Sequence, residues 1–453
     1  MFAVSLCFGQ GRRQIAWEDL PAALRSGFAR EGFGARMAGI DRATAERERL
    51  GEYDHLIFYM LQSERFTREP RIEPARSAYE FYQGLREGER APYLAEARNF
   101  GGYAERVPAG VRARMRDLLR ALARPSARDS AEDERLAWFR FFLAREAGAA
   151  SMERLSAEYA RAMQFLYRKE FGARAMTPAE AAAYVSSLYQ ERAHSTDTQI
   201  EANFAVHEAL AALRAQQPGT RIARVLIVGP GMDFAPRTDL MDLFGPQSYQ
   251  PFAVADSLLG LGLAKPDDLR IDCVDINERV IAHLGGLAAR GAVTLSLLSG
   301  IADAPARPLT DDFRAYFQNL GRGLGAESPI EVPARYRSHL HKAVRVRPEA
   351  ARMIRATRLN IITERIEPPA RFDLVIVTNV FPYFSASELT LALTNIAAML
   401  AGGGFLIHNE LQAVPPAVID ALGLPLQQAR TVLLAADERQ PLFDGIAIHR
   451  KRQ

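Results

Sequence analysis

The feature that most constrains the fold is an alternation of short apolar runs and helical patterns, which begins near residue 220. The runs are rich in Val, Ile and Leu and carry no polar face, which is typical of strands buried in a parallel sheet. Amphipathic stretches separate them, so the sequence predicts an α/β fold with a doubly wound, mostly parallel sheet. The predicted strands are RVLIV (224–228), RIDCVDI (270–276), LNIIT (359–363), FDLVIVTNV (372–380) and GGFLIHNE (403–410).

Two later segments break this alternation. ARTVLLAAD (429–437) and FDGIAIHRKR (443–452) read as strands with no helix between them, which predicts an antiparallel hairpin at the end of the sheet. Residues of about 298–357 are rich in Arg and Pro and are expected to form a partly helical insertion.

The first 200 residues instead show the pattern of apolar residues that is typical of helices. Apolar residues recur there at three- and four-residue spacing, and Thr177 with Glu180 forms a capping-box pattern at the start of one helix. A chain of 453 residues is too long for a single ordinary core. We therefore expect a helical N-terminal domain over 1–200 and an α/β domain over 201–453.

The bulk composition excludes several classes of protein. A net charge of +3 is small for this length and gives no argument for nucleic acid or an anionic membrane. Two cysteines cannot build a disulfide framework or a metal knuckle, and His339 and His341 have no evident third ligand, so no metal is predicted. No apolar stretch reaches the roughly 18–20 residues of a membrane span. A cytoplasmic location is expected, with a truncated signal peptide at the apolar start left open.

The stretch GPGMD follows the first predicted strand and clears side chains from its backbone at Gly229 and Gly231. In doubly wound sheets, ligands bind beyond the carboxyl ends of the strands. A dinucleotide fingerprint needs a third glycine, but that position is Phe234, and no G-K-[ST] of a phosphate-binding loop follows. A nucleoside-type ligand without phosphates remains.

Asp275 ends the second predicted strand, where a carboxylate can accept hydrogen bonds from two vicinal ribose hydroxyls. The alternative is that Asp275 only caps the following helix, although Asn277 can do so equally well.

These segments resemble, in order and spacing, the class I S-adenosylmethionine-dependent methyltransferases, which have a Rossmann-like sheet. The resemblance covers about 220–453 and rests on strand–GxG, strand–Asp, FDLVIVTNVFPYF, MLAGGGFLIHNE and the terminal hairpin. YQPFAVADSLLGLG, the insertion with FRAYFQNL, NVFPYF and HNE are similar to the chemotaxis-receptor glutamate methyltransferases. The glycine loop here lacks that family's acidic Gly-Glu-Glu run, so the resemblance implies fold and cofactor and leaves the acceptor open.

The resemblance implies S-adenosyl-L-methionine as the cofactor. Gly229 and Gly231 would let the backbone approach its amino-acid end, and Asp233 would receive its ammonium or, alternatively, cap a helix. Asp275 would hold the ribose. Glu364 matches the position that holds the adenine amino group, with simple surface exposure as the alternative.

The ends of the fourth and fifth strands are expected to converge near the methyl group. They carry Asn379, Tyr383, His408 and Glu410. Tyr383 is the best candidate to line the acceptor pocket, or else an aromatic plug on the sheet. His408 is a possible base or a structural hydrogen-bonding histidine.

The sequence thus predicts a methyltransferase acting on an unidentified O- or N-nucleophile, on a small molecule or a protein side chain. The alternatives are a non-catalytic binding or scaffold protein of the same fold, and another transferase such as an aminopropyl transferase. The strand-4 loop TNVFPYF lacks the acidic cluster expected for a polyamine acceptor, which counts against the last of these.

Overall fold

The structure is a computed structural model. It describes residues 11–95, 106–124, 136–137, 139–140, 142–143, 151–174, 176–191, 200–233, 244–287, 293–367, 371–411, 414–437 and 441–453. The apolar start and Phe234, both used in the sequence predictions, lie outside these residues. The described chain divides into two compact units, each treated by itself below. None of the helices in the described ranges is long and apolar enough to cross a membrane.

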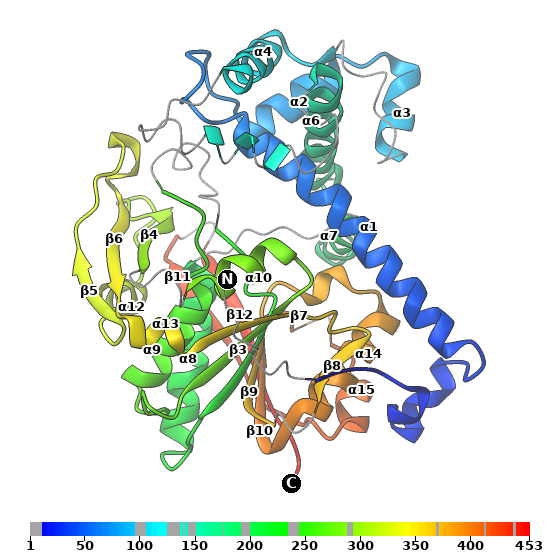
Figure 1. Cartoon of the computed structure of the whole chain (residues 1–453), viewed down its shortest axis with the longest axis vertical. Coiled ribbons are helices and arrows are strands. Elements are labelled where there is room, and N and C mark those ends of the chain that lie inside the picture. Colours follow the sequence, from blue (N-terminus) through cyan, green and yellow to red (C-terminus); the bar gives the residue numbers. More distant parts are fainter. Residues whose placement is uncertain are drawn as a thin grey trace, which may run out of the picture. The chain divides into compact units, whose positions relative to one another are not determined.

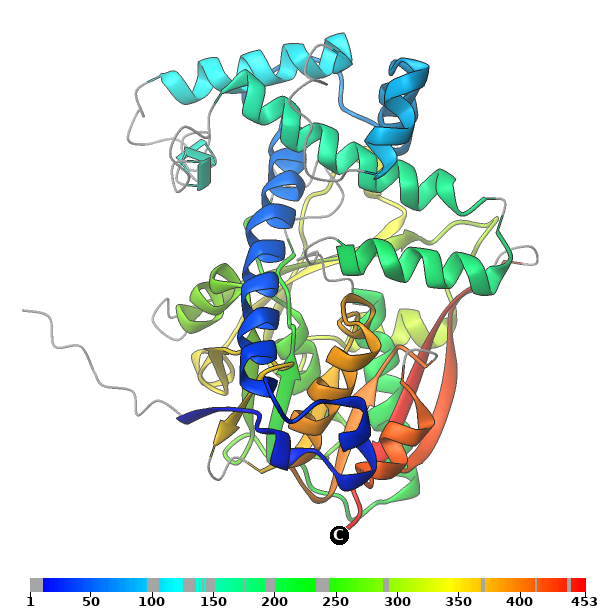
Figure 2. The same cartoon turned by 90° about the vertical axis from the view of Figure 1, so that its right-hand side faces the viewer.

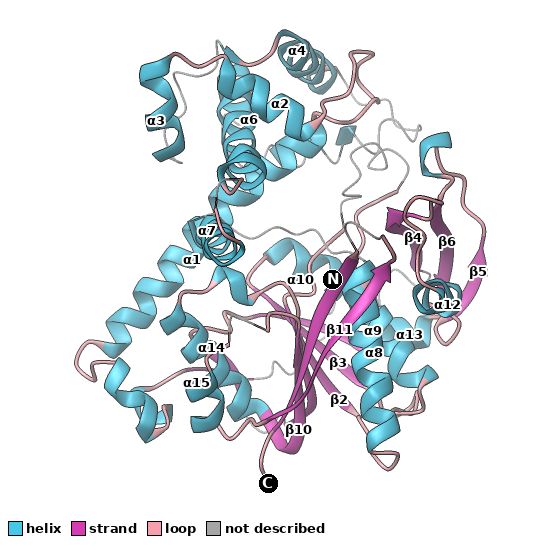
Figure 3. Cartoon of the chain, turned by 180° about the vertical axis from the view of Figure 1, so that it is seen from behind, coloured by secondary structure: helices cyan, strands magenta, loops and turns pink. Residues whose placement is uncertain are grey.

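A seven-stranded sheet organises the first unit (Figures 1 and 3), in the order β11-β12-β10-β9-β2-β3-β7. Five neighbouring strands, from β10 to β7, pair in parallel, and β12 is antiparallel to both β10 and β11. The predicted doubly wound sheet and its C-terminal antiparallel hairpin are therefore confirmed. The bounds are β2 (Arg224–Val228), β3 (Arg270–Asp275), β7 (Ile354–Arg358), β9 (Phe372–Val377), β10 (Leu400–His408), β11 (Leu426–Ala435) and β12 (Leu442–Arg450).

The strand β2 lies at the centre, where the direction of winding reverses. From β2 the chain builds outward through β3 and β7, and it then returns to place β9 on the other side of β2. Val225, Leu226 and Ile227 are completely buried because helices cover both faces of the sheet. This reversal is the position at which doubly wound sheets bind ligands.

Helices pack on both faces of this sheet. In Figures 1 and 3, α8 and α9 lie on one face and α14 and α15 on the other. The helix α14 begins at a capping box in which Ser385 and Glu388 satisfy each other's backbone N–H groups. The helices are α8 (Ile200–Gln216), α9 (Gln250–Gly260), α10 (Glu278–Gly285), α14 (Ala386–Met399) and α15 (Pro416–Ala421).

The predicted strand at 359–363 is wrong. The third parallel strand is β7, formed by the preceding residues IRATR, while 359–363 make a turn beyond its carboxyl end. As an edge strand, β7 needs only one partner and tolerates charged residues, so it lacks the apolar signature of its neighbours. The apolar side chains of Ile361 and Ile362 instead enter the core beside α14.

The insertion differs from the expected partly helical segment, because most of it is a small antiparallel sheet of order β4-β6-β5. It starts earlier than predicted, at residue 293, and the residues after 353 belong to the main sheet. Its elements are β4 (Val293–Ala302), α12 (Asp311–Asn319), β5 (Gly325–Ser328), β6 (His339–Val346) and α13 (Pro348–Arg352).

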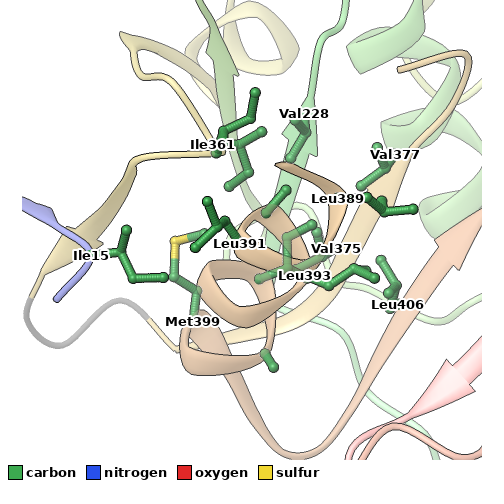
Figure 4. Close-up of a cluster of buried hydrophobic side chains, with 14 of the residues drawn as sticks. Ile15, Val228, Ile361, Val375, Val377, Leu389, Leu391, Leu393, Met399 and Leu406 are labelled. Carbon is green, nitrogen blue, oxygen red and sulfur yellow. The ribbon is translucent and has the colours of Figure 1, made fainter. Parts of the chain in front are cut away.

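Residues 11–45 belong to the first unit, although the sequence predicts them as part of a separate helical domain over 1–200. The strand β1 (Gly11–Gln14) pairs with β8 (Glu364–Glu367) in a two-stranded ribbon. Figure 2 shows this N-terminal segment, in dark blue, running beside the orange helices, and Figure 4 shows Ile15 packed near Met399 and Leu391 of α14. Further core residues from this segment are Leu20, Phe28, Phe33 and Met37.

The second unit is helical, as the sequence predicts for this region, and is built mainly from described residues between 46 and 191. The predicted capping box is present at the start of α7, where Thr177 N donates to Glu180 Oε2 at 2.9 Å. Its helices include α2 (Pro74–Gln83), α3 (Glu87–Ala95), α4 (Ala109–Ala123), α6 (Met152–Tyr167) and α7 (Pro178–Glu191), together with the second half of α1 (Phe33–Met60).

Candidate ligand site at the carboxyl edge of the sheet

The glycine loop leaves the central strand β2 through two left-handed residues. Gly229 has φ 67° and Gly231 has φ 65°, a region that L side chains rarely adopt. The N–H of Gly229 donates to the carbonyl of Val274 on β3 at 2.8 Å. A Cβ atom on Gly229 would lie 2.6 Å from Val380 Cγ2, just beyond β9. The position therefore requires glycine for its conformation and because the side chain of Val380 packs against it, while the approach of a ligand to this backbone stays a prediction.

Asp233 closes this loop by pairing with Gln247. Their backbones exchange two hydrogen bonds of 2.6 and 3.0 Å, and Gln247 Nε2 donates to Asp233 Oδ2 at 3.2 Å. Gln247 also holds the backbone of Ser296 in β4 through both ends of its amide. The Asp233 carboxylate is thus oriented by the protein.

Asp275 ends β3 at the same edge of the sheet and is buried, with 9% of its surface exposed. Its Oδ1 accepts from Asn277 N at 2.9 Å. Asn277 is the residue that caps α10, through a hydrogen bond from Arg279 N of 2.9 Å. The capping role that the sequence left open for Asp275 is therefore filled by Asn277.

Glu364 lies on the two-stranded ribbon and not on the main sheet, opposite Gln14 of β1. Its carboxylate accepts from Asn360 N at 3.3 Å and lies 3.9 Å from Arg12 Nη1. These contacts give Glu364 partners within the protein, and its assignment to an adenine amino group stays a prediction.

The ends of β9 and β10 meet through a pair of asparagines. Asn379 N donates to Asn409 Oδ1 at 2.9 Å, and Asn409 Nδ2 returns a hydrogen bond to Asn379 Oδ1 at 3.0 Å. Asn379 has φ 57°, the one non-glycine residue with positive φ among those described. Such a strained residue is held by its surroundings and is often found at a binding site. Tyr383 follows in a short 3-10 helix, half-buried.

His408 is almost fully buried beside His449, with 3.0 Å between the two Nε2 atoms. His449 Nδ1 lies 2.9 Å from the carbonyl of Leu424, so it donates there, and its Nε2 accepts from His408 Nε2. Burial, followed by the field of His449, lowers the pKa of His408 to about 3. This geometry favours the structural alternative for His408 over the role of a base.

Both imidazoles are therefore neutral in the folded protein and take up protons in the unfolded chain near the ordinary pKa of 6.5. The stability that they contribute is fully present above pH 6.5 and is lost as the pH falls toward about 3. Between pH 7.5 and 5.5 we expect His408 alone to lower the free energy of unfolding by about 1.4 kcal/mol.

Urea unfolding at the two pH values measures this loss. Glu410, whose pKa is raised, acts in the opposite direction, so the comparison is made against a His408→Phe/His449→Leu variant, which should lack the loss. His341→Gln, at a partly exposed site on β6, should behave as wild type. An identical pH response in the double variant would contradict the prediction.

Glu410 follows His408 by two residues and has an unusual environment. Both carboxyl oxygens are buried and make no hydrogen bond to any described residue. The backbone N–H groups of Asn379 and Val380 face the carboxyl without reaching hydrogen-bond geometry. Burial, and then the nearby carboxyl of Asp444 on β12, raise the pKa of Glu410 to about 8.

Several polar residues at this edge had no recognisable signal in the sequence. Gln250, the first residue of α9, donates to Thr378 Oγ1 at the end of β9 at 2.8 Å. Gln250 Oε1 and the neighbouring Ser248 Oγ are buried without a hydrogen-bond partner in the described part of the chain. Gln250, Asn409 and Asp444 become informative only when the fold brings the strand ends together.

The two insertion histidines are occupied by backbone contacts. His339 Nδ1 lies 2.9 Å from the carbonyl of Ser299, and His341 Nδ1 lies 2.7 Å from that of His339. Across the residues that the structure describes, no three His, Cys, Asp or Glu side chains are grouped to hold a metal ion.

Comparison with known proteins finds only distant similarity, and only to solved structures. No family model and no curated protein matches the sequence. Among solved structures, the N-methyltransferase NodS of Bradyrhizobium japonicum, in complex with S-adenosyl-L-homocysteine, is 14% identical, with 57% of this chain and 90% of that one covered and a TM-score of 0.28. Magnesium protoporphyrin IX methyltransferase ChlM of Synechocystis, with bound S-adenosylmethionine, is 8% identical, with coverages of 63% and 93% and a TM-score of 0.27. The CurJ carbon methyltransferase is 13% identical, with coverages of 84% and 97% and a TM-score of 0.28.

Likenesses this distant say nothing about activity, and the strand order carries the assignment of the fold. Five parallel strands wound in both directions from β2, closed by an antiparallel C-terminal hairpin, form the doubly wound α/β sheet that the sequence predicts. The closer resemblance to chemotaxis-receptor glutamate methyltransferases stays a prediction.

Proposed function

We propose that the protein is an S-adenosyl-L-methionine-dependent methyltransferase. The observation that carries the proposal is the glycine loop at the reversal of the sheet. Gly229 and Gly231 both have positive φ, and a Cβ on Gly229 would collide with Val380. A backbone so cleared of side chains, with the buried Asp275 at the end of the adjacent strand, fits a nucleoside ligand lying across the strand ends.

The proposed cofactor contacts follow from this arrangement. The loop at Gly229 and Gly231 approaches the amino-acid end, and the oriented carboxylate of Asp233 receives the ammonium. Asp275 accepts hydrogen bonds from the ribose hydroxyls, a role supported by Asn277 capping α10 in its place. Glu364 is proposed for the adenine amino group on the resemblance alone.

The acceptor is proposed to meet the methyl group beside the ends of β9 and β10. Asn379 is held in a left-handed conformation there, and the half-buried Tyr383 follows within four residues. A phenol has an ordinary pKa of about 10, so Tyr383 is suited to orient the acceptor and not to remove its proton. Methyl transfer mainly requires alignment of acceptor and methyl carbon, which rigid strand ends provide.

Titration calorimetry tests the cofactor assignment. We expect the protein to bind S-adenosylmethionine and S-adenosylhomocysteine and not NAD. Asp275→Asn keeps the oxygen that accepts from Asn277 and removes the charge, so it should weaken binding by about 2 kcal/mol, roughly 30-fold. Asp268→Asn, at an exposed carboxylate ahead of β3, is the matched control and should bind as wild type. Equal affinity in wild type and Asp275→Asn would remove the ribose role.

Turnover separates the proposal from the alternatives. A binding or scaffold protein of the same fold would bind the cofactor and transfer no methyl group to any class of acceptor. An aminopropyl transferase would use decarboxylated S-adenosylmethionine as its donor and discriminate against S-adenosylmethionine itself.

A further inference from the structure

A buried acidic pair lies at the carboxyl edge of the sheet. Glu410 follows β10 and Asp444 lies on the adjacent antiparallel strand β12, near the point where β12 enters the sheet. The pairing of His408 with Ala447 brings the two carboxyls onto neighbouring chain segments. Burial raises the pKa of both, and Asp444 adds to the effect on Glu410.

The two carboxyls differ in how well the protein satisfies them. Asp444 Oδ1 accepts from Gly445 N at 2.8 Å, and this N–H and the facing side chain of Asn409 hold down its pKa against the effect of burial. Glu410 has no hydrogen bond to either oxygen among the described residues. A buried carboxyl left this way costs free energy unless a ligand donates to it.

The location ties Glu410 to the proposed reaction. The N–H groups of Asn379 and Val380 face its carboxyl, and Val380 is the residue that packs on Gly229. Val380 therefore lies between the Glu410 carboxyl and the glycine loop, and the backbone continues from Val380 to Tyr383.

Resting on the proposed function, we infer that the methyl acceptor is a primary or secondary amine and that Glu410, supported by Asp444, removes its proton. An N–H group supplies the donor that the Glu410 oxygens lack. A carboxylate acceptor would instead bring a third acid to the buried pair, which is unfavourable.

The proton and electron balance is complete without a further reactant. The neutral amine nitrogen forms a bond to the methyl carbon of the sulfonium donor, while the sulfur–carbon bond breaks and its electron pair stays on sulfur. The alkylated nitrogen then carries a positive charge, and one N–H proton passes to the Glu410 carboxylate, which later releases it to water.

Radiolabelled methyl transfer from S-adenosylmethionine to a matched set of peptides tests this inference. The peptides differ only at one position, which carries Lys, Glu, Ser or Cys, and a free alkylamine forms a separate arm. We expect methylation of the Lys peptide, the alkylamine or both, and none of the Glu peptide. The two amine arms distinguish a protein side chain from a small molecule. Methylation of the Glu, Ser or Cys peptide alone would overturn the inference.

Two variants separate a catalytic Glu410 from a structural one. The group that removes the proton must be ionised, so kcat/KM should rise with pH through about 8 in the wild type. In Glu410→Gln this rise of kcat/KM with pH should disappear, and kcat should fall by about 100-fold. Asp444→Asn should move this rise in kcat/KM toward lower pH, because Asp444 raises the pKa of Glu410. Asp420→Asn, at an exposed carboxylate of α15, is the control.

Calorimetry with S-adenosylhomocysteine on each variant keeps the outcomes distinct. The inference is supported if Glu410→Gln keeps the cofactor affinity of the wild type and no longer shows the rise of kcat/KM near pH 8. A rise near pH 8 that persists in Glu410→Gln overturns the inference and leaves the proposed function standing. Failure of the wild type to bind the cofactor overturns the proposed function and the inference together.

Discussion

Gly229→Ala should weaken cofactor binding by roughly 100-fold or more. It should also lower the free energy of unfolding by about 2–5 kcal/mol. Two effects add. A left-handed alanine costs about 1–2 kcal/mol, and a Cβ placed 2.6 Å from Val380 Cγ2 forces the loop or β9 to move at about 1–3 kcal/mol more. Calorimetry and thermal unfolding measure the two consequences.

Gly262→Ala is the matched control for this variant. Gly262 has φ 65°, nearly that of Gly229, but a Cβ there meets nothing within 4 Å. It should show the conformational cost alone and retain cofactor binding. Adding Val380→Ala to Gly229→Ala should recover part of the lost stability, since it removes the colliding methyl group. Equal losses in the two glycine variants would show that the collision with Val380 is unimportant.

Arg114→Met should destabilise the helical unit by about 3–5 kcal/mol. Arg114, on α4, is fully buried, and its guanidinium donates to the carbonyls of Leu61, Ser63, Glu69 and Pro70. Methionine fills a similar volume but leaves these buried backbone carbonyls without their donor, and each such loss is costly. The guanidinium thus holds the segment that follows α1 against α4.

Arg116→Met supplies the control, because Arg116 lies two residues away on the same helix and is exposed. Its effect should stay within about 0.5 kcal/mol. Urea unfolding followed by far-ultraviolet circular dichroism measures both. A loss below about 1 kcal/mol in Arg114→Met would mean that water replaces the guanidinium, and that the segment does not depend on it.

Among the parallel strands, the clearest sequence signals come from those buried on both faces. The runs at 224–228 and 372–377 are continuous in Val, Ile and Leu because helices cover them from both sides. The edge strand β7 was missed because its residues, IRATR, include two exposed arginines and only one fully buried side chain. The neighbouring LNIIT was mistaken for it, since apolar β-branched residues in a packed turn have the same composition as a strand.

The site residues that could be predicted are those whose signal lies in their own short segment of sequence. A glycine by itself indicates a backbone conformation that other residues avoid, and both Gly229 and Gly231 have positive φ in the structure. The orphaned carboxyl of Glu410 and the pairing of His408 with His449 depend on which residues β12 brings beside β10, a contact across about 40 residues.

By itself, the sequence determined the kind of sheet, its C-terminal hairpin, the helical character of the N-terminal region and the place of the glycine loop. Periodicity and backbone preference act over a few residues, so they can be read locally. Only the tertiary structure decided that residues 11–45 pack against α14, that Asn277 caps α10 beside Asp275, and that Glu410 is buried next to Asp444. Burial and charge interactions arise between segments distant in the chain, and folding alone brings those segments together.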